Sequence, residues 1–250
     1  MLPDLITPSW IYWAHSLQFL AYGEFIEGEH WKRFRDLRCP IFRDANHVAV
    51  QPGALLEMAE LAELVAQQRA EGALPCLDLY EEDPEQISVI RALGFEPEES
   101  AFSMMTWRAR PRLATEGTAD AEMVAKDQWS EVQRKLHDGP MPAWVKHAVS
   151  CESAFEHLTP YASYRDCTYA AGLVRYDWET FSQIETVFTH PHFRRRGAAT
   201  DCLRLALSQS PHPEILLFVS VDNSAAQRLY ESLGASLEVV RGGQRWFVPT

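Results

Sequence analysis

The chain has 250 residues, which is enough for one large domain or two modest ones. Its 23 Lys and Arg side chains against 35 Asp and Glu give a net charge of −12, which argues against a nucleic acid or an anionic membrane as partner. Hydrophobic residues make up 46% of the chain, as in ordinary globular proteins.

The N-terminal 25 residues are rich in aromatic side chains but lack the basic start of a signal peptide. His15 and Gln18 interrupt the apolar run, so we expect a helix or strand packed on a core and no membrane span. The five cysteines are widely spaced and contain no C-x-x-C pair, which indicates neither a disulfide framework nor a zinc site. We therefore expect a reduced, cytoplasmic setting and no bound metal.

Strands and helices alternate through the first half of the chain. The hydrophobic period and the turn residues predict a strand at 45–53 that runs into Pro52 and an amphipathic helix at 55–72. They then predict a strand at 74–82, a helix at 84–95 that contains Leu93-Gly94 near its end, and a strand at 101–109. The segment 108–120 is rich in Pro, Gly, Thr and charge and has no apolar period, so it is predicted to link two domains, 1–114 and 115–250.

The second half shows the same alternation. Two strands at 168–179 and 182–190 precede a helix at 199–210, a continuous apolar strand at 214–221 and a helix at 223–234 that Gly234 closes. A final pair of strands, 236–240 and 244–249, is predicted around Gly242-Gly243.

The two halves also share the Pro and Leu-Gly residues that mark the ends of their strands and helices. Pro52 and Pro191 are 139 residues apart, and Leu93 and Leu233 are 140 apart. The order strand, Pro, helix, strand, helix, Leu-Gly, strand recurs, so we interpret the chain as an internal duplication of one α/β module. The alternative is that two unrelated units agree in length by chance, because the alternation of strand and helix is common in proteins.

A run of three arginines lies between a strand and a helix in the second half. The helix start leaves free backbone N–H groups that suit an anion, Gly197 permits close approach, and Arg194 to Arg196 add charge suited to phosphate oxygens. The patterns G-x-x-x-x-G-K-[ST] and G-x-G-x-x-G are absent, which argues against the usual nucleoside triphosphate and dinucleotide sites. A pyrophosphate is the expected ligand.

The spacing of Val187, Pro191, Arg194, Gly197 and Ala199 resembles the acetyl-CoA loop of the GNAT superfamily of N-acetyltransferases, whose pattern is R/Q-x-x-G-x-G/A. Downstream, VDNSAAQRLYESLGA resembles the second signature of the family, an Asn followed by a helix with a Tyr and a closing Leu-Gly. The resemblance covers roughly residues 115–250. It implies an α/β fold of two tandem GNAT-like mixed-sheet modules with helices on both faces.

The resemblance also implies roles for individual residues. Acetyl-CoA would be the co-substrate, with its pyrophosphate held by the backbone of Arg194, Arg195, Arg196, Gly197, Ala198, Ala199 and Thr200. Its pantetheine arm would pair with the backbone of Val187, Phe188 and Thr189 where the family splays two strands apart, and Asn223 would contact it. Tyr230 would be the general acid for the departing thiolate; it lies two helical turns after Asn223 and so shares its face.

Each of these residues also has a purely structural interpretation. The arginines suit a solvated turn, Asn223 suits a helix cap, as do Asp222 and Ser224, and Tyr230 suits core packing. Glu185, on the strand before the loop, is the candidate general base, with a surface strand residue as the alternative. Further candidates with weaker arguments are His190, Asp177, Glu179, Trp144 and His147.

The first half lacks this chemistry. At the repeat offset of 140, Tyr230 falls on Ile90 and Asn223 on Asp83, and Glu57 at the start of the corresponding helix would repel a phosphate. We therefore predict that residues 1–114 form a GNAT-like module without a working CoA site. Its aromatic residues either line an acceptor pocket or pack in the core: Trp10, Tyr12, Trp13, Tyr22 and Trp31.

The sequence thus predicts an N-acetyltransferase that moves an acetyl group from acetyl-CoA to a primary amine by direct attack. The alternative is a non-catalytic CoA-binding sensor or interaction protein on the same scaffold. The acceptor and the oligomeric state have no signal in the sequence.

Overall fold

The computed structural model describes residues 2–3, 5–81, 83–98, 101–109, 120–137 and 139–249. These residues form a mixed α/β fold, as predicted, and divide into two compact units. The N-terminal unit comprises Leu5–Ser103, Ser220–Asp222 and Val239–Thr250. The C-terminal unit comprises Met1–Asp4, Met104–Val219 and Asn223–Glu238.

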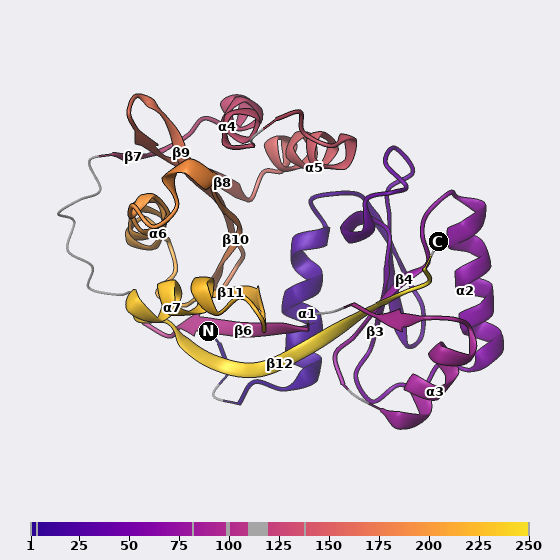
Figure 1. Ribbon diagram of the computed structural model, residues 1–250. Helices are drawn as coiled ribbons and strands as arrows, with labels where there is room; N and C mark the ends of the chain where they lie inside the picture. The colour runs from indigo at the N-terminus through magenta and orange to yellow at the C-terminus, as the bar shows by residue number, and fades with distance from the viewer. Residues whose placement is uncertain are drawn as a thin grey trace. The chain divides into compact units, whose positions relative to one another are not determined.

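The N-terminal unit is a mixed sheet with helices on both faces (Figure 1). Its strands lie in the order β1-β2-β3-β4-β12, of which β3 and β4 are parallel and the other neighbours are antiparallel. The elements are α1 (Pro8–Phe19), β1 (Glu24–Glu27), β2 (Trp31–Arg35), η1 (Arg43–Ala45), β3 (Val48–Val50), α2 (Met58–Ala70), β4 (Cys76–Leu79), α3 (Pro84–Ala92) and β5 (Glu96–Pro97), which also pairs with β12.

Alternation along β3 and β4 sorts side chains between the two faces of this sheet. Val48, Val50 and Leu77 point to the face that α2 and α3 cover, and they are buried in one apolar cluster. Each fully buried aliphatic side chain of this kind contributes about 1.5–3 kcal/mol. His47 and Asp78 alternate to the opposite face, where a buried polar cluster forms beside α1.

Two strands contribute residues to both units. β6 (Phe102–Trp107) begins in the N-terminal unit and continues in the C-terminal unit, while β12 (Ser236–Phe247) does the reverse. The boundaries of the compact units therefore differ by short segments from those of the domains 1–114 and 115–250. This division into two domains stays a prediction. Most of the predicted linker, 110–119, lies outside the described residues.

The predicted pair of strands around Gly242-Gly243 is wrong, because β12 is one continuous strand. The two glycines serve packing instead of a turn. A Cβ at Gly243 would lie 2.4 Å from Cζ of Phe102, and one at Gly242 would lie 3.0 Å from the same ring. The strand therefore needs glycine here to leave room for an aromatic ring.

The C-terminal unit is built on β12-β6-β11-β10-β9-β8-β7. β10 and β11 are parallel, while β7, β8, β9 and β10 pair antiparallel. Its further elements are β7 (Ala121–Met123), η2 (Lys126–Gln128), α4 (Trp129–Leu136), α5 (Ala143–Ala154), β8 (Leu158–Arg165), β9 (Thr168–Asp177), β10 (Ser182–Thr189), η3 (Pro191–Phe193), α6 (Ala198–Ser208), β11 (Ile215–Ser220) and α7 (Ser224–Ser232).

Helices α4 and α6 cover opposite faces of β9 (Figure 1). On one face, Cys202 of α6 contacts the carbonyl of Ala171; on the other, Gly172 lies against Leu136 of α4. Helix α6 buries Leu203, Ala206 and Leu207, the residues that its apolar period predicts. No helix in the described part of the chain has the length and apolar character needed to cross a membrane.

Candidate active site

Strands β10 and β11 separate partway along their length. They pair only from Ser182 to Ile184, whereas β10 continues to pair with β9 as far as Thr189. The register with β9 shifts between Glu185 and Phe188, and Thr186 in this bulge has a φ of 55°. A left-handed conformation is strained for a β-branched residue, so the bulge is a defined feature of the strand. The strands diverge as the family resemblance implies.

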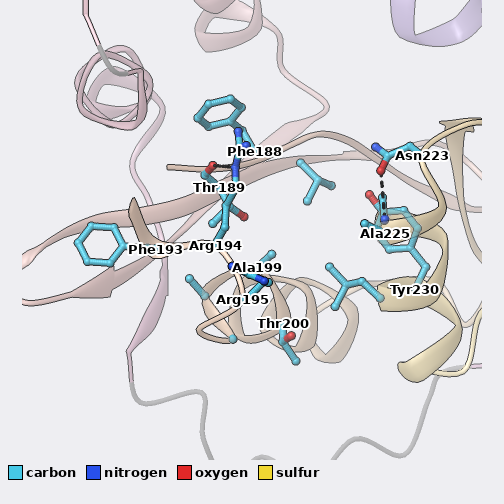
Figure 2. Close-up of a pocket in the computed structure, with 15 residues that line it drawn as sticks. Phe188, Thr189, Phe193, Arg194, Arg195, Ala199, Thr200, Asn223, Ala225 and Tyr230 are labelled. Carbon is cyan, nitrogen blue, oxygen red and sulfur yellow. Dashed lines mark hydrogen bonds between the residues drawn. The ribbon is translucent and has the colours of Figure 1, made fainter. Parts of the chain in front are cut away.

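A cavity of about 580 Å³ opens beside the divergence, entirely within the C-terminal unit. In Figure 2, Phe188 and Thr189 of β10 lie on one side, Asn223 and Tyr230 on the other, and the start of α6 below them. Ten of the eleven residues expected to bind the cofactor line this cavity: Val187, Phe188, Thr189, Arg194, Arg195, Gly197, Ala198, Ala199, Thr200 and Asn223. The position of these ten residues around one cavity agrees with the expectation that they share a site. The cavity itself identifies no ligand.

The loop before α6 reverses sharply through two left-handed residues. Arg195 has a φ of 62° and Gly197 a φ of 80°, with Gly197 as the N-cap of α6. A glycine at this cap has no side chain to satisfy the first N–H groups of the helix, so they are available to a ligand. Arg194 and Arg195 are exposed at the cavity, and Nε of Arg194 donates to the carbonyl of Thr189 at 3.4 Å.

Arg196 is the predicted residue that does not line the cavity. Its guanidinium instead lies 5.8 Å from the ring centroid of Phe193, a distance at which a cation and an aromatic face attract.

Helix α7 brings Asn223 and Tyr230 to one side of the cavity. Asn223 is the N-cap of α7, and its Oδ1 accepts a hydrogen bond from the N–H of Ala226 at 3.1 Å. The structural interpretation of Asn223 therefore holds, and the residue also faces the cavity. The capping hydrogen bond uses the amide oxygen of Asn223, and the amide N–H₂ group takes no part in it.

The Tyr230 side chain is 5% exposed and packs edge-on against Trp107, with ring centroids 6.3 Å apart. Burial raises the pKa of Tyr230 well above its ordinary value, and the negative charge of Glu185 raises it further. Both causes keep the phenol protonated at neutral pH, which is the state that a general acid requires.

Glu185 lies on β10 immediately before the bulge and is half-buried. It does not line the cavity, but its charge acts on Tyr230. Its Oε1 accepts a hydrogen bond from Nε2 of Gln183 at 2.9 Å, and Oε1 of Gln183 accepts one from Nε1 of Trp178 at 3.2 Å. The fully buried Gln183 has no motif that could have drawn attention to it in the sequence; only the i, i+2 spacing along a strand places it beside Glu185.

The weaker candidates are distributed elsewhere. His190 is the N-cap of η3, and its Nδ1 accepts from the N–H of His192 at 3.2 Å. Asp177 is held by Arg175 at 2.8 Å, so its charge is already paired, while Glu179 is exposed. Trp144 and His147 lie on α5, and none of these residues lines the cavity. The aromatic residues of the first 31 positions belong to the N-terminal unit.

The corresponding place in the N-terminal unit holds a smaller cavity of about 110 Å³, beside Pro52, Gly53 and Asp83. Asp83 caps α3 as Asn223 caps α7. Oε1 of Gln86 accepts a hydrogen bond from the N–H of Leu56 at 2.7 Å, so a side chain occupies one N–H just before α2. Ile90 is buried at the position that corresponds to Tyr230.

Comparison with known proteins identifies a family whose model matches the part of the chain that forms this cavity. Residues 122–235 match the model of the acetyltransferase (GNAT) family. No curated protein has a significant sequence match to the chain.

Several solved structures are similar over most of the chain. A GCN5-related N-acetyltransferase from Kribbella flavida is similar with a TM-score of 0.71 and 15% identity, over 99% of this chain and 97% of that one. A functionally unknown conserved protein from Staphylococcus epidermidis is similar with a TM-score of 0.70 and 13% identity, over 90% and 93%. A tandem GNAT protein from the clavulanic acid biosynthesis pathway has a TM-score of 0.54 and 13% identity, over 80% and 73%. At these identities the likeness shows the fold alone.

Proposed function

We propose that the protein, whose residues 122–235 match the model of the acetyltransferase (GNAT) family, transfers an acetyl group from acetyl-CoA to a primary amine by direct attack. The observation that carries the proposal is the cavity itself. It opens where β10 leaves β11, reaches the N-terminus of α6, and is bordered by Tyr230.

The lining residues fit the two ends of coenzyme A. The N–H groups at the start of α6 and the exposed guanidinium groups of Arg194 and Arg195 suit a diphosphate, and Gly197 lines the cavity with no side chain of its own. Val187, Phe188 and Thr189 have no register partner on β11 within the described residues, so this edge of β10 can bind the amides of pantetheine as an added strand would.

Glu185 and Tyr230 provide the proposed acid–base pair. Glu185 takes a proton from the incoming ammonium, directly or through water, and the free amine attacks the carbonyl carbon of the thioester. A backbone N–H of β10 stabilises the charge that develops on the carbonyl oxygen. The C–N bond forms, the C–S bond breaks, and Tyr230 gives its proton to the departing thiolate. The charge of Glu185 acts on Tyr230, which supports their action at one centre.

The setting that we propose follows from the same chemistry. None of the five cysteines, all of which lie in the described residues, forms a disulfide, in keeping with a reducing cytoplasm. The net charge of −12 favours a cationic acceptor such as an ammonium over a nucleic acid or an anionic membrane.

Isothermal titration of acetyl-CoA tests the proposal. The wild type should bind one cofactor in the C-terminal unit, and a double variant, Arg194→Glu with Gly197→Glu, should lose binding while remaining folded by circular dichroism. A matched variant, Arg134→Glu with Gly139→Glu, makes the same charge change in the same unit outside the cavity and should bind normally. A well-folded wild type that does not bind acetyl-CoA would overturn the proposal.

A further inference from the structure

A buried carboxylate lies in the first turn of α6, the helix whose N-terminus is the proposed phosphate site. Asp201 lies in the first turn of α6, and its side chain is only 10% exposed. Its N–H is already used by the carbonyl of Gly197 at 3.0 Å. An acidic side chain in the first turn suits the helix dipole, but it repels any anion that approaches the same N–H groups. The helix therefore carries a charge that opposes the ligand proposed for it.

Arg165 pairs with this carboxylate from another element. It is the last residue of β8, its Nη2 forms a hydrogen-bonded ion pair with Oδ2 of Asp201, and its Nη1 lies 3.2 Å from Oδ2 of Asp120. Nη1 also donates to the carbonyl of Tyr164 at 2.6 Å. The side chain is 21% exposed, so its position is fixed by several contacts instead of by solvent.

The guanidinium of Arg165 also lies directly beside the loop. Its Nη2 is the nearest atom to the point where a Cβ on Gly197 would stand, at 3.9 Å. Gly197 is the N-cap that the diphosphate is proposed to approach. The guanidinium of Arg165 thus contacts Asp201 and also lies beside Gly197, which lines the cavity.

From these contacts we propose that Arg165 is a positioning residue for the cofactor: it neutralises Asp201 and so makes the N-terminus of α6 able to accept a diphosphate. This inference rests on the proposed function. Arg165 acts through Asp201 and takes no part in the chemistry of acetyl transfer. A part-buried pair is screened less by salt than exposed charges are, so its effect persists at physiological ionic strength.

A purely structural ion pair is the competing explanation, and a double-mutant cycle separates the two. Arg165→Met leaves Asp201 uncompensated and should raise the Kd for CoA about tenfold or more. Asp201→Asn removes the repulsion and frees the guanidinium, so it should lower the Kd about threefold. The double variant, Arg165→Met with Asp201→Asn, should return to within about threefold of the wild type. It also removes the buried unpaired carboxylate that could unfold the single variant.

The decisive readout uses a donor without phosphates. Acetyl-pantetheine shares the reacting thioester but has no diphosphate, so Arg165→Met should change its kcat/KM less than twofold. Arg134→Met, which removes the same charge from an exposed site on α4, is the matched control and should change neither value. Equal losses with CoA and acetyl-pantetheine, or an Asp201→Asn variant that binds CoA more weakly, would overturn the inference alone. A wild type that does not bind CoA would overturn the proposed function and this inference together.

Discussion

The side-chain amide of Gln183 donates a hydrogen bond of 2.9 Å to Oε1 of Glu185, two residues further along β10. The amide is itself oriented by Trp178, whose indole N–H donates to Oε1 of Gln183 at 3.2 Å. Gln183 is fully buried between two paired strands, so this arrangement fixes the direction of the carboxylate before any substrate arrives.

Replacing Gln183 by Met should therefore weaken catalysis without weakening cofactor binding. A hydrogen bond to a charged group contributes roughly 1.5–3 kcal/mol, so kcat/KM should fall about tenfold to a hundredfold. The Kd for CoA should stay within about twofold of the wild type, because Gln183 does not line the cavity. Gln133→Met is a matched control, since Gln133 is equally buried on α4 but its Nε2 has no hydrogen-bond partner in the described residues. An unchanged kcat/KM in Gln183→Met, or an equal loss in Gln133→Met, would contradict the role.

Replacing Tyr230 by Phe should remove the proton donor and keep the ring. The Tyr230 ring packs on Trp107, so the fold and the Kd for CoA should change little. Loss of general acid catalysis should lower kcat by about 10² to 10⁴. Because burial and Glu185 raise the pKa of Tyr230, wild-type activity should not fall through ionisation of this phenol up to about pH 10.

Tyr169→Phe removes a hydroxyl from the same unit away from the cavity and serves as the control for Tyr230→Phe. Equal kcat in the Tyr230→Phe variant and the wild type would favour a sensor, or another donor, over the proposed acid.

The order of elements around the cavity was predictable because local signals specify it. Pro191, Gly197 and Leu233-Gly234 mark a strand end, a helix start and a helix end, and each depends on the backbone of its own neighbours. All of the predicted cofactor residues except Asn223 lie in two short segments, 187–189 and 194–200. Local order was therefore sufficient to bring nearly all of them to one cavity.

Contacts between distant segments were not predictable in this way. The glycines of β12 look like a turn until the ring of Phe102 is known to lie against them. Arg165 meets Asp201 only because the β8–β9 hairpin ends beside α6, and no spacing in the sequence marks that pair. Such errors arise where tertiary packing overrides a local preference.

Gly172 limits how closely α4 approaches the sheet, and this makes a stability prediction. A Cβ at Gly172 would lie 2.9 Å from Cδ1 of Leu136 and 3.2 Å from the ring of Trp129. Gly172→Ala should overpack this interface and destabilise the protein by about 1–3 kcal/mol in chemical denaturation. Combining it with Leu136→Ala removes the closest atom, so the double variant should lose less stability than the sum of the single variants. Strict additivity would show that the contact is unimportant.

The buried polar cluster of the N-terminal unit should make stability depend on pH. Burial lowers the pKa of His47 to about 4 and that of His15 to about 3, despite the nearby carboxylate of Asp78. In the unfolded chain both imidazoles take up protons near pH 6.5, so folding gains its full stability above that pH and loses it as the pH falls toward 4. Arg245 lowers the pKa of Asp78 to about 2, which adds a further loss only below about pH 4.

Urea unfolding at a series of pH values measures this dependence. The midpoint should be constant above about pH 7 and fall steadily from about pH 6.5 to pH 4, by an amount that corresponds to a few kcal/mol. His47→Asn retains an N–H for the carbonyl of Asp44, which Nδ1 of His47 contacts at 3.0 Å, and should flatten the slope. A midpoint that does not change between pH 7 and pH 4.5 would contradict the prediction.

The two units should differ in their capacity for the cofactor, so acetyl-CoA should bind with a stoichiometry of one per chain. In the N-terminal unit the side chain of Gln86 occupies the N–H of Leu56, and the remaining cavity of about 110 Å³ is less than a quarter of the volume of the other. Replacing Gln86 by Ala should free the N–H, yet Glu57 at the N-cap of α2 would still repel a diphosphate. Titration of wild type and Gln86→Ala should therefore give one site in each, while Arg194→Glu with Gly197→Glu should give none. A second site in the wild type, or residual binding in the double variant, would show that the N-terminal unit retains a working cofactor site.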